Sequence, residues 1–207
     1  MMFDGGTHSH ASALEQATAT ARALIEGAER LRNRSMNEVP LLAWLPFLKL
    51  ATEDSDVNSC DPVICEVLLF GSVAKKAEDV GDVDLMVLDT GFYSMLVLNQ
   101  DRRDDGTLPD SKEGALQDNL RLLLGGYMEY EEDLIEGLSL IPTDLHVLPC
   151  RVVTDEAFRE EIAQQHLDPY FFENAFSCMM RYERTCSAFV PTTLIELQSQ
   201  LRIRESA

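Results

Sequence analysis

Two aspartates, Asp82 and Asp84, stand one residue apart inside the apolar stretch DVDLMVLD at residues 82–89. Alternate side chains of a β-strand lie on the same face, so a strand here would place both carboxylates side by side. Neighbouring carboxylates repel each other unless a positive group lies between them. A divalent cation would relieve that repulsion, and a ligand set made only of oxygens favours Mg²⁺ or Mn²⁺.

A third carboxylate, Asp144, lies in a later strand-like run, SLIPTDLHVLP at residues 139–149. Leu145 and Val147 would lie on the opposite face of that strand. If this strand neighbours the strand at 82–89, three carboxylates converge and form a metal site. The alternative is an ordinary strand–helix–strand unit whose acidic residues point to solvent.

Gly71 and Ser72 directly follow another apolar run, VICEVLLF at residues 63–70. A strand that passes through such a turn into a helix leaves free backbone N–H groups, which bind anions. Glycine lets the backbone approach a ligand closely, and the serine hydroxyl adds a donor. Lys75, one helical turn further, is placed to reach a phosphate as a point charge. An anion cradle beside an acidic metal site is expected for a metal-bound nucleoside triphosphate.

Gly71-Ser72, then nine residues, then Asp82-Val83-Asp84-Leu85, with Asp144 on a later strand, resembles the DNA polymerase β-like nucleotidyltransferase superfamily. The resemblance covers about residues 63–149. It is closest to the minimal nucleotidyltransferases, small prokaryotic proteins often encoded beside a helical HEPN partner.

The resemblance implies a role for each of these residues. Ser72 would contact the triphosphate, and Gly71 would allow its approach. Asp82 and Asp84 would bind two Mg²⁺ ions, while Asp144 would complete one metal site and help to activate the attacking hydroxyl. One ion would lower the pKa of the nucleophile, and the other would stabilise the triphosphate and the leaving pyrophosphate.

The stretch GSVAKK at residues 71–76 departs from the Gly-Ser-x-Ala-Arg-Gly sequence of many family members. Lys75 replaces an arginine and cannot bind phosphate through a bidentate fork. Lys76 stands where glycine is common. Neither difference removes a metal ligand.

The function implied is Mg²⁺-dependent transfer of a nucleoside monophosphate, with ATP as the expected donor, to a hydroxyl of an acceptor. A protein acceptor, such as a HEPN-type toxin of a toxin–antitoxin pair, is the first expectation. A small molecule, as in aminoglycoside nucleotidyltransferases, is the second, and RNA is the third. A different class of function is a non-catalytic module that binds NTP or neutralises a toxin.

Charge bears on the partner. The chain has 36 acidic and 17 basic residues, a formal net charge of −19. The first fifty residues carry five of each, so the excess lies in residues 51–207. Because proteins that bind nucleic acid normally offer a basic face to the phosphates, nucleic acid is a less favoured partner here. A small molecule, a cationic ligand or a protein suits this charge better.

The five cysteines include no CxxC pair, and the N-terminus lacks a basic region followed by an apolar core. We therefore expect free thiols, no signal peptide and a cytoplasmic location. The most apolar segment, residues 41–51, is too short to span a membrane and contains Pro46 and Lys49.

The elements that must position the site indicate an α/β (α+β) fold, a small mixed sheet with packed helices. We expect a helical N-terminal extension at residues 1–55, a nucleotidyltransferase core at 56–150 and a helical C-terminal cap at 151–207. The helix at 11–33 is interpreted as a packing helix. The other expected elements are strands at 63–70, 82–89 and 139–149, a short helix at 72–79, loops at 52–62 and 99–112, and helices at 113–138, near 154–166, from Asp168-Pro169 and after Pro191.

Three histidines and one aromatic stretch leave alternatives open. His146 would share a strand face with Asp144, where a proton-transfer role is possible but a hydrogen-bonded core position is favoured. His8 and His10 are expected to be disordered. PYFFENAF at residues 169–176 is interpreted as core packing, with a nucleotide-base pocket as the alternative.

Overall fold

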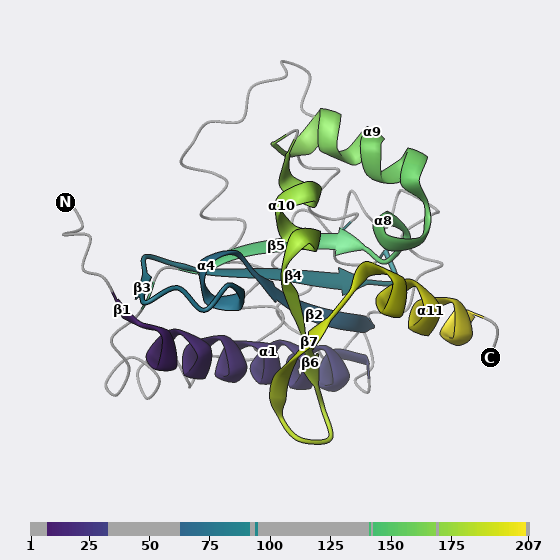
Figure 1. Cartoon of the computed structure of the whole chain (residues 1–207). Helices are drawn as coiled ribbons and strands as arrows, with labels where there is room; N and C mark the ends of the chain where they lie inside the picture. Colours follow the sequence, from purple (N-terminus) through teal and green to yellow (C-terminus); the bar gives the residue numbers. More distant parts are fainter. Residues whose placement is uncertain are drawn as a thin grey trace, which may run out of the picture.

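The computed structural model describes residues 8–32, 63–91, 94, 141, 143–168 and 170–205. Its centre is a mixed five-stranded sheet with the strand order β5-β4-β2-β6-β7 (Figure 1). The strands are β2 (Ile64–Phe70), β4 (Val83–Asp89), β5 (Thr143–Pro149), β6 (Met179–Glu183) and β7 (Ala188–Thr192). The mixed α/β architecture is therefore as predicted.

The order and register of the strands determine where the acidic residues lie. β4 pairs antiparallel with β2 and parallel with β5. Asp84 lies opposite Asp144 on β5 and opposite Phe70 on β2. Because directly opposite residues of paired strands share a sheet face, Asp84 and Asp144 project to the same side. The predicted neighbourhood of these two strands is confirmed.

One face of the sheet is covered by α1 (His10–Arg32), which runs along it (Figure 1). Ala13, Ala17 and Ala21 are fully buried and belong to the same apolar cluster as Val67 and Leu85 of the sheet. Small side chains at three- and four-residue spacing let a helix approach a sheet closely. The helix thus packs as the periodicity at 11–33 predicts, and it shares one core with the sheet.

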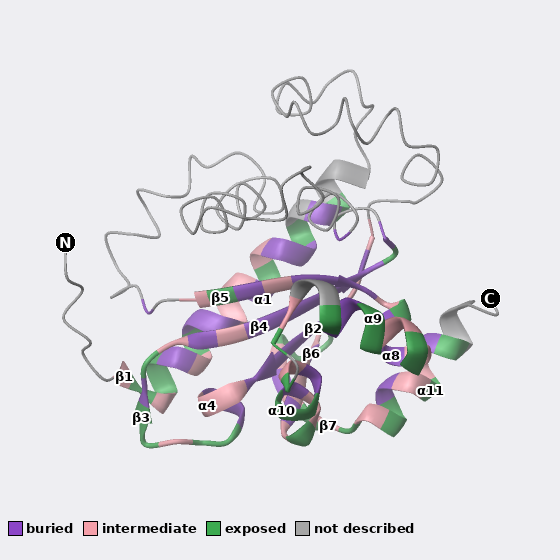
Figure 2. Cartoon of the chain, turned by 90° about the horizontal axis from the view of Figure 1, so that it is seen from above, coloured by how far each residue is buried: buried purple, intermediate pink, exposed green. Residues whose placement is uncertain are grey.

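The opposite face is covered by helices from the C-terminal part of the chain: α8 (Arg151–Thr154), α9 (Glu156–His166), α10 (Phe171–Ser177) and α11 (Leu194–Glu205). Their apolar side chains meet Leu68, Met86 and Leu88 in a second cluster. Both faces of β2 and β4 are therefore buried, as the continuous apolar runs require. Figure 2 shows this burial along the central strands.

The predicted C-terminal helical cap is wrong in one respect, because residues 179–192 form the hairpin β6–β7. β6 pairs antiparallel with β2 and extends the sheet. The turn between the two strands contains Ser187 at φ 50, a left-handed position that glycine usually fills. The sequence therefore lacks the glycine signal by which such hairpins are recognised.

The segment before β4 also differs from the prediction. The helix expected at 72–79 is a single turn, α4 (Gly71–Ala74). The end of the predicted helix instead forms β3 (Asp79–Val80), which pairs antiparallel with β1 (His8–Ser9). His8 and His10 are consequently ordered, contrary to the prediction.

Several predictions fall outside the described residues: the loops at 52–62 and 99–112, the helix at 113–138 and the boundary between residues 55 and 56. The strand expected at 139–149 is seen over Thr143–Pro149. Among the described helices, none combines the length and the apolar character needed to cross a membrane. No disulfide links Cys65, Cys150, Cys178 or Cys186, the four cysteines that the structure describes.

Candidate functional site

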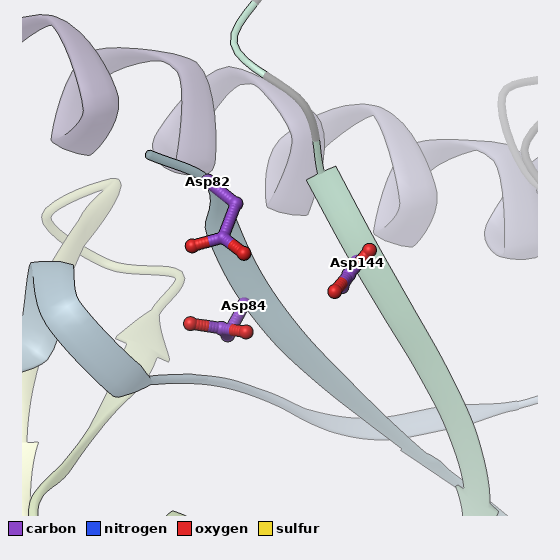
Figure 3. Close-up of side chains that lie close together, drawn as sticks. All are labelled: Asp82, Asp84 and Asp144. Carbon is purple, nitrogen blue, oxygen red and sulfur yellow. The ribbon is translucent and has the colours of Figure 1, made fainter. Parts of the chain in front are cut away.

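Asp82, Asp84 and Asp144 come together at one end of the sheet. Each offers a carboxylate oxygen, and these oxygens all lie within 4.8 Å of one another. Figure 3 shows Asp82 and Asp84 side by side, with Asp144 on the neighbouring strand. Asp82 and Asp84 are half-buried and Asp144 is exposed, so the cluster opens to solvent. The predicted convergence of three carboxylates is confirmed.

Negative charge accumulates at this cluster. Partial burial, followed by the charges of Asp82 and Asp144, raises the pKa of Asp84 to about 6, and Lys75 opposes the rise only in part. A carboxyl with so high a pKa is held in an environment that disfavours its charged form. Three carboxylates with excess negative charge and no histidine or thiol among them fit a hard divalent cation such as Mg²⁺ or Mn²⁺.

Gly71 forms the turn that lies against Asp84. Its φ is +67, and a Cβ added to it would overlap Oδ2 of Asp84 and lie 2.7 Å from Cγ. Both the left-handed backbone and the lack of space require glycine here. The turn after β2 is thereby held in direct contact with a residue of the acidic cluster.

Ser72 follows with a side-chain hydroxyl that is buried and has no hydrogen-bond partner among the described residues. Buried hydroxyl groups are normally paired, so an unsatisfied one in the residue directly after Gly71 requires a reason. A phosphate oxygen of a ligand would satisfy it.

The helix that follows this turn, α4, is one turn long, so the dipole that it adds to the free N–H groups is small. Lys75 is exposed at the end of this turn, and its charge acts on Asp84. Anion binding here would depend mainly on Ser72 and Lys75. Lys76 has a positive φ of 58, the left-handed conformation that glycine adopts without strain.

His146 lies beside Asp144 but is not held as predicted. Its ring packs against Phe70 and Phe171, with centroid distances of 5.9 and 4.6 Å. Burial lowers the pKa of His146, while the charge of Asp144 acts in the opposite direction. Aromatic contacts, rather than the expected hydrogen bond, are what the described residues provide. Phe172 of the same aromatic stretch is buried in the core, as predicted.

Two residues make contacts with the site-bearing segments that the sequence did not predict. His10 donates from Nε2 to the carbonyl of Val73, at 2.9 Å. Gln16 is buried, with 7% exposure, and hydrogen-bonds the backbone of Ile141. The sequence holds one signal for such a contact. Gln16 directly precedes Ala17, which lies on the apolar stripe of the helix, so a polar side chain stands at the edge of the buried face.

The structure thus brings the predicted site residues to two neighbouring places, the acidic cluster and the turn after β2. Asp82, Asp84 and Asp144 form the cluster, Gly71 lies against it, and Ser72 and Lys75 follow in the same turn.

Comparison of the chain with protein-family models, with curated proteins and with solved structures found no match.

Proposed function

We propose that the protein is a Mg²⁺-dependent nucleotidyltransferase that transfers a nucleoside monophosphate, with ATP as the donor, to an acceptor hydroxyl. The observation that carries the proposal is the convergence of Asp82, Asp84 and Asp144 beside the Gly71–Ser72 turn. The resemblance of these residues to the nucleotidyltransferase motif supports the same reading.

Each residue has a physical task in this proposal. Asp82, Asp84 and Asp144 hold two Mg²⁺ ions, with Mn²⁺ as a possible substitute; such ions lower the pKa of an attacking hydroxyl and stabilise charge on a triphosphate. Ser72 donates its hydroxyl to a phosphate oxygen, and Lys75 adds positive charge. Gly71 keeps the turn free of a side chain.

The reaction balances without a covalent enzyme intermediate. The acceptor oxygen attacks the α-phosphorus, the bond between the α-phosphorus and the bridging oxygen breaks, and pyrophosphate leaves. The acceptor's proton passes to a base. We assign this role to Asp144, and its exposure beside the other two carboxylates supports the assignment.

For the acceptor we propose a protein of the HEPN toxin type, in a cytoplasmic toxin–antitoxin pair. The resemblance to minimal nucleotidyltransferases and the net charge of −19, which disfavours RNA, support this choice. A cationic small molecule of the aminoglycoside type is the second candidate, because the same charge attracts cations.

Thermal unfolding with each of the four NTPs, with and without Mg²⁺, tests the site. A ligand at a hundredfold its dissociation constant adds about 2.7 kcal/mol to the free energy of unfolding. We expect stabilisation that needs both Mg²⁺ and ATP and that is absent from the Asp82→Asn/Asp84→Asn variant. The matched control is Glu78→Gln/Asp79→Asn, which removes two exposed charges nearby and should keep the stabilisation.

Stabilisation by ATP and Mg²⁺ that survives in the Asp82→Asn/Asp84→Asn variant would refute the metal assignment. Once binding is established, ATP labelled at the α-phosphate distinguishes the acceptors: label appears on a HEPN-type protein, on an aminoglycoside, or on neither. Binding without transfer to any acceptor would identify a non-catalytic module.

A further inference from the structure

Residues 8–16 contact all three segments that carry the candidate site. This stretch contains β1 and the first two turns of α1. The three segments are the Gly71–Lys75 turn, the residues leading to Asp82, and the start of β5 with Asp144. Figure 1 shows β1 and the beginning of α1 at the same end of the sheet as α4 and β3.

The first contact is with the turn after β2. His10 donates from Nε2 to the carbonyl oxygen of Val73, at 2.9 Å. The same oxygen accepts the backbone N–H of Lys76, at 3.0 Å, and Ala77 donates to the carbonyl of Ser72, at 3.0 Å. His10 is thus part of the hydrogen bonding that closes the turn in which Ser72 lies.

The second contact is with the residues that precede Asp82. His8 lies opposite Val80, and Ser9 lies opposite Asp79, in the antiparallel pair β1–β3. This pairing involves the backbone, so it does not depend on the His8 side chain.

The third contact is with the start of β5. The Gln16 amide accepts the N–H of Ile141 at 2.9 Å and donates to the carbonyl of Ile141 at 2.5 Å and to Oγ1 of Thr143 at 2.8 Å. Thr143 directly precedes Asp144. A buried side chain whose donor and acceptor are both used fixes its partners in one arrangement.

We propose that residues 8–16 are a positioning element for the site, with His10 holding the triphosphate-binding turn and Gln16 holding Asp144 in register with Asp84. This inference rests on the proposed function. It assigns the two side chains separate effects: His10 acts on triphosphate affinity, and Gln16 acts on metal affinity. A helix that served only to cover the sheet would produce no such separation.

The test uses full-length variants that keep side-chain volume. His10→Leu removes the donor to Val73, whereas His10→Gln retains an amide donor at a similar reach. Gln16→Met removes all three hydrogen bonds of Gln16. Thr18→Val is the matched control, because Thr18 donates only within α1, to the carbonyl of Leu14 at 2.8 Å.

Mn²⁺ affinity is measured by electron paramagnetic resonance, and affinity for ATP with Mg²⁺ by calorimetry. We expect Gln16→Met to weaken Mn²⁺ binding by about tenfold, a loss typical of residues that support metal ligands. We expect His10→Leu to weaken ATP binding with Mn²⁺ affinity unchanged, and His10→Gln to restore ATP binding. Thr18→Val should change neither affinity.

Hydrogen exchange of the metal-free protein supplies an independent readout. His10→Leu should speed exchange at the amides of Lys76 and Ala77, and Gln16→Met should speed it at the start of β5. Wild-type affinities in both variants would overturn the inference, as would a His10→Gln variant that behaves like His10→Leu.

A wild-type protein that binds neither Mn²⁺ nor ATP would instead refute the proposed function. The exchange pattern would then still decide whether residues 8–16 hold these segments. Unchanged exchange in both variants would overturn the inference in that case as well.

Discussion

Asp84 occupies the space that a side chain on Gly71 would need: a Cβ there would overlap Oδ2 of Asp84 and lie 2.7 Å from its Cγ. The turn after β2 therefore has no room for a side chain at Gly71 as long as Asp84 keeps its position on β4. Their contact joins the turn that we propose to bind triphosphate to the cluster that we propose to bind metal ions.

Gly71→Ala should lower the free energy of unfolding by at least about 2 kcal/mol. The left-handed φ of +67 and the overlap with Asp84 both oppose a side chain. Urea denaturation measures the loss. Gly81→Ala is the matched control and should be nearly neutral, because a Cβ on Gly81 meets nothing within 4 Å. Equal stability of the two variants would contradict the contact.

Asp84→Asn should stabilise the metal-free protein at neutral pH. Burial and the charges of Asp82 and Asp144 raise the pKa of Asp84 from 3.8 to about 6. Between these two values the folded protein keeps a proton that the unfolded chain has released, so wild-type stability falls as pH rises through this window. With allowance for solvent screening of this half-buried group, the gain is about 1–2 kcal/mol above pH 6.

Urea denaturation at pH 5.0, 6.0 and 7.5 in the presence of a chelator follows this dependence while staying above the sequence pI of about 4.4. The advantage of Asp84→Asn over wild type should widen from pH 5.0 to pH 7.5. Asp79→Asn, which removes an exposed charge nearby, should show no such widening. An advantage that does not change with pH would rule out the raised pKa.

Ser72→Ala and Ser94→Ala should have opposite effects on the protein without ligand. The Ser72 hydroxyl is buried without a partner among the described residues, so its removal should be neutral or stabilising. Ser94 is fully buried and donates to Oδ1 of Asp89, so Ser94→Ala should cost about 1–3 kcal/mol. Urea denaturation compares the two variants.

Affinity for ATP with Mg²⁺ should depend on Ser72 and not on Ser94, the reverse of what we expect for stability. Ser72→Ala should weaken binding by about 1–3 kcal/mol, the value of a hydrogen bond to a charged group, and Ser94→Ala should not. Calorimetry measures both affinities. Unchanged ATP affinity in Ser72→Ala would remove this residue from the site.

His146 should titrate below its ordinary pKa of 6.5, since burial against Phe70 and Phe171 disfavours the charged ring. Because the unfolded chain takes up this proton more readily than the folded protein, the free energy of unfolding is highest at neutral pH. It decreases as pH falls below 6.5. NMR titration of the His146 ring proton, assigned with the His146→Phe variant, measures the pKa. The same variant should keep nucleotidyl transfer; loss of transfer in a stable His146→Phe protein would assign the ring to proton transfer.

The sequence was sufficient to predict the elements whose signal is local. The strands at 63–70 and 82–89 and the helix at 11–33 were placed within one residue of their observed bounds, because each is a long apolar run or a clear helical periodicity. The pairing of Asp84 with Asp144 could be predicted only on the condition that their strands are neighbours, and no local sequence pattern determines strand order. Only the sheet register resolves it.

The missed features depend on contacts between distant parts of the chain. Strand β6 is short, and it forms through pairing with β7 and with the distant strand β2. His10 and Gln16 carry no sequence signal for their partners, Val73 and Ile141, which lie far along the chain. Hydrogen bonds of this kind follow from tertiary structure rather than from propensity.

The position of β2 has a consequence for biosynthesis. This strand lies between β4 and β6, with Leu68 paired to Met86 on one side and to Arg181 on the other. A ribosome that has translated as far as β5 has produced only one of the two strands that neighbour β2. The free edge of β2 stays open to other chains until Met179–Glu183 leaves the exit tunnel. Sheet completion is therefore a late event in translation, and a transcript cut before this point would encode an aggregation-prone product.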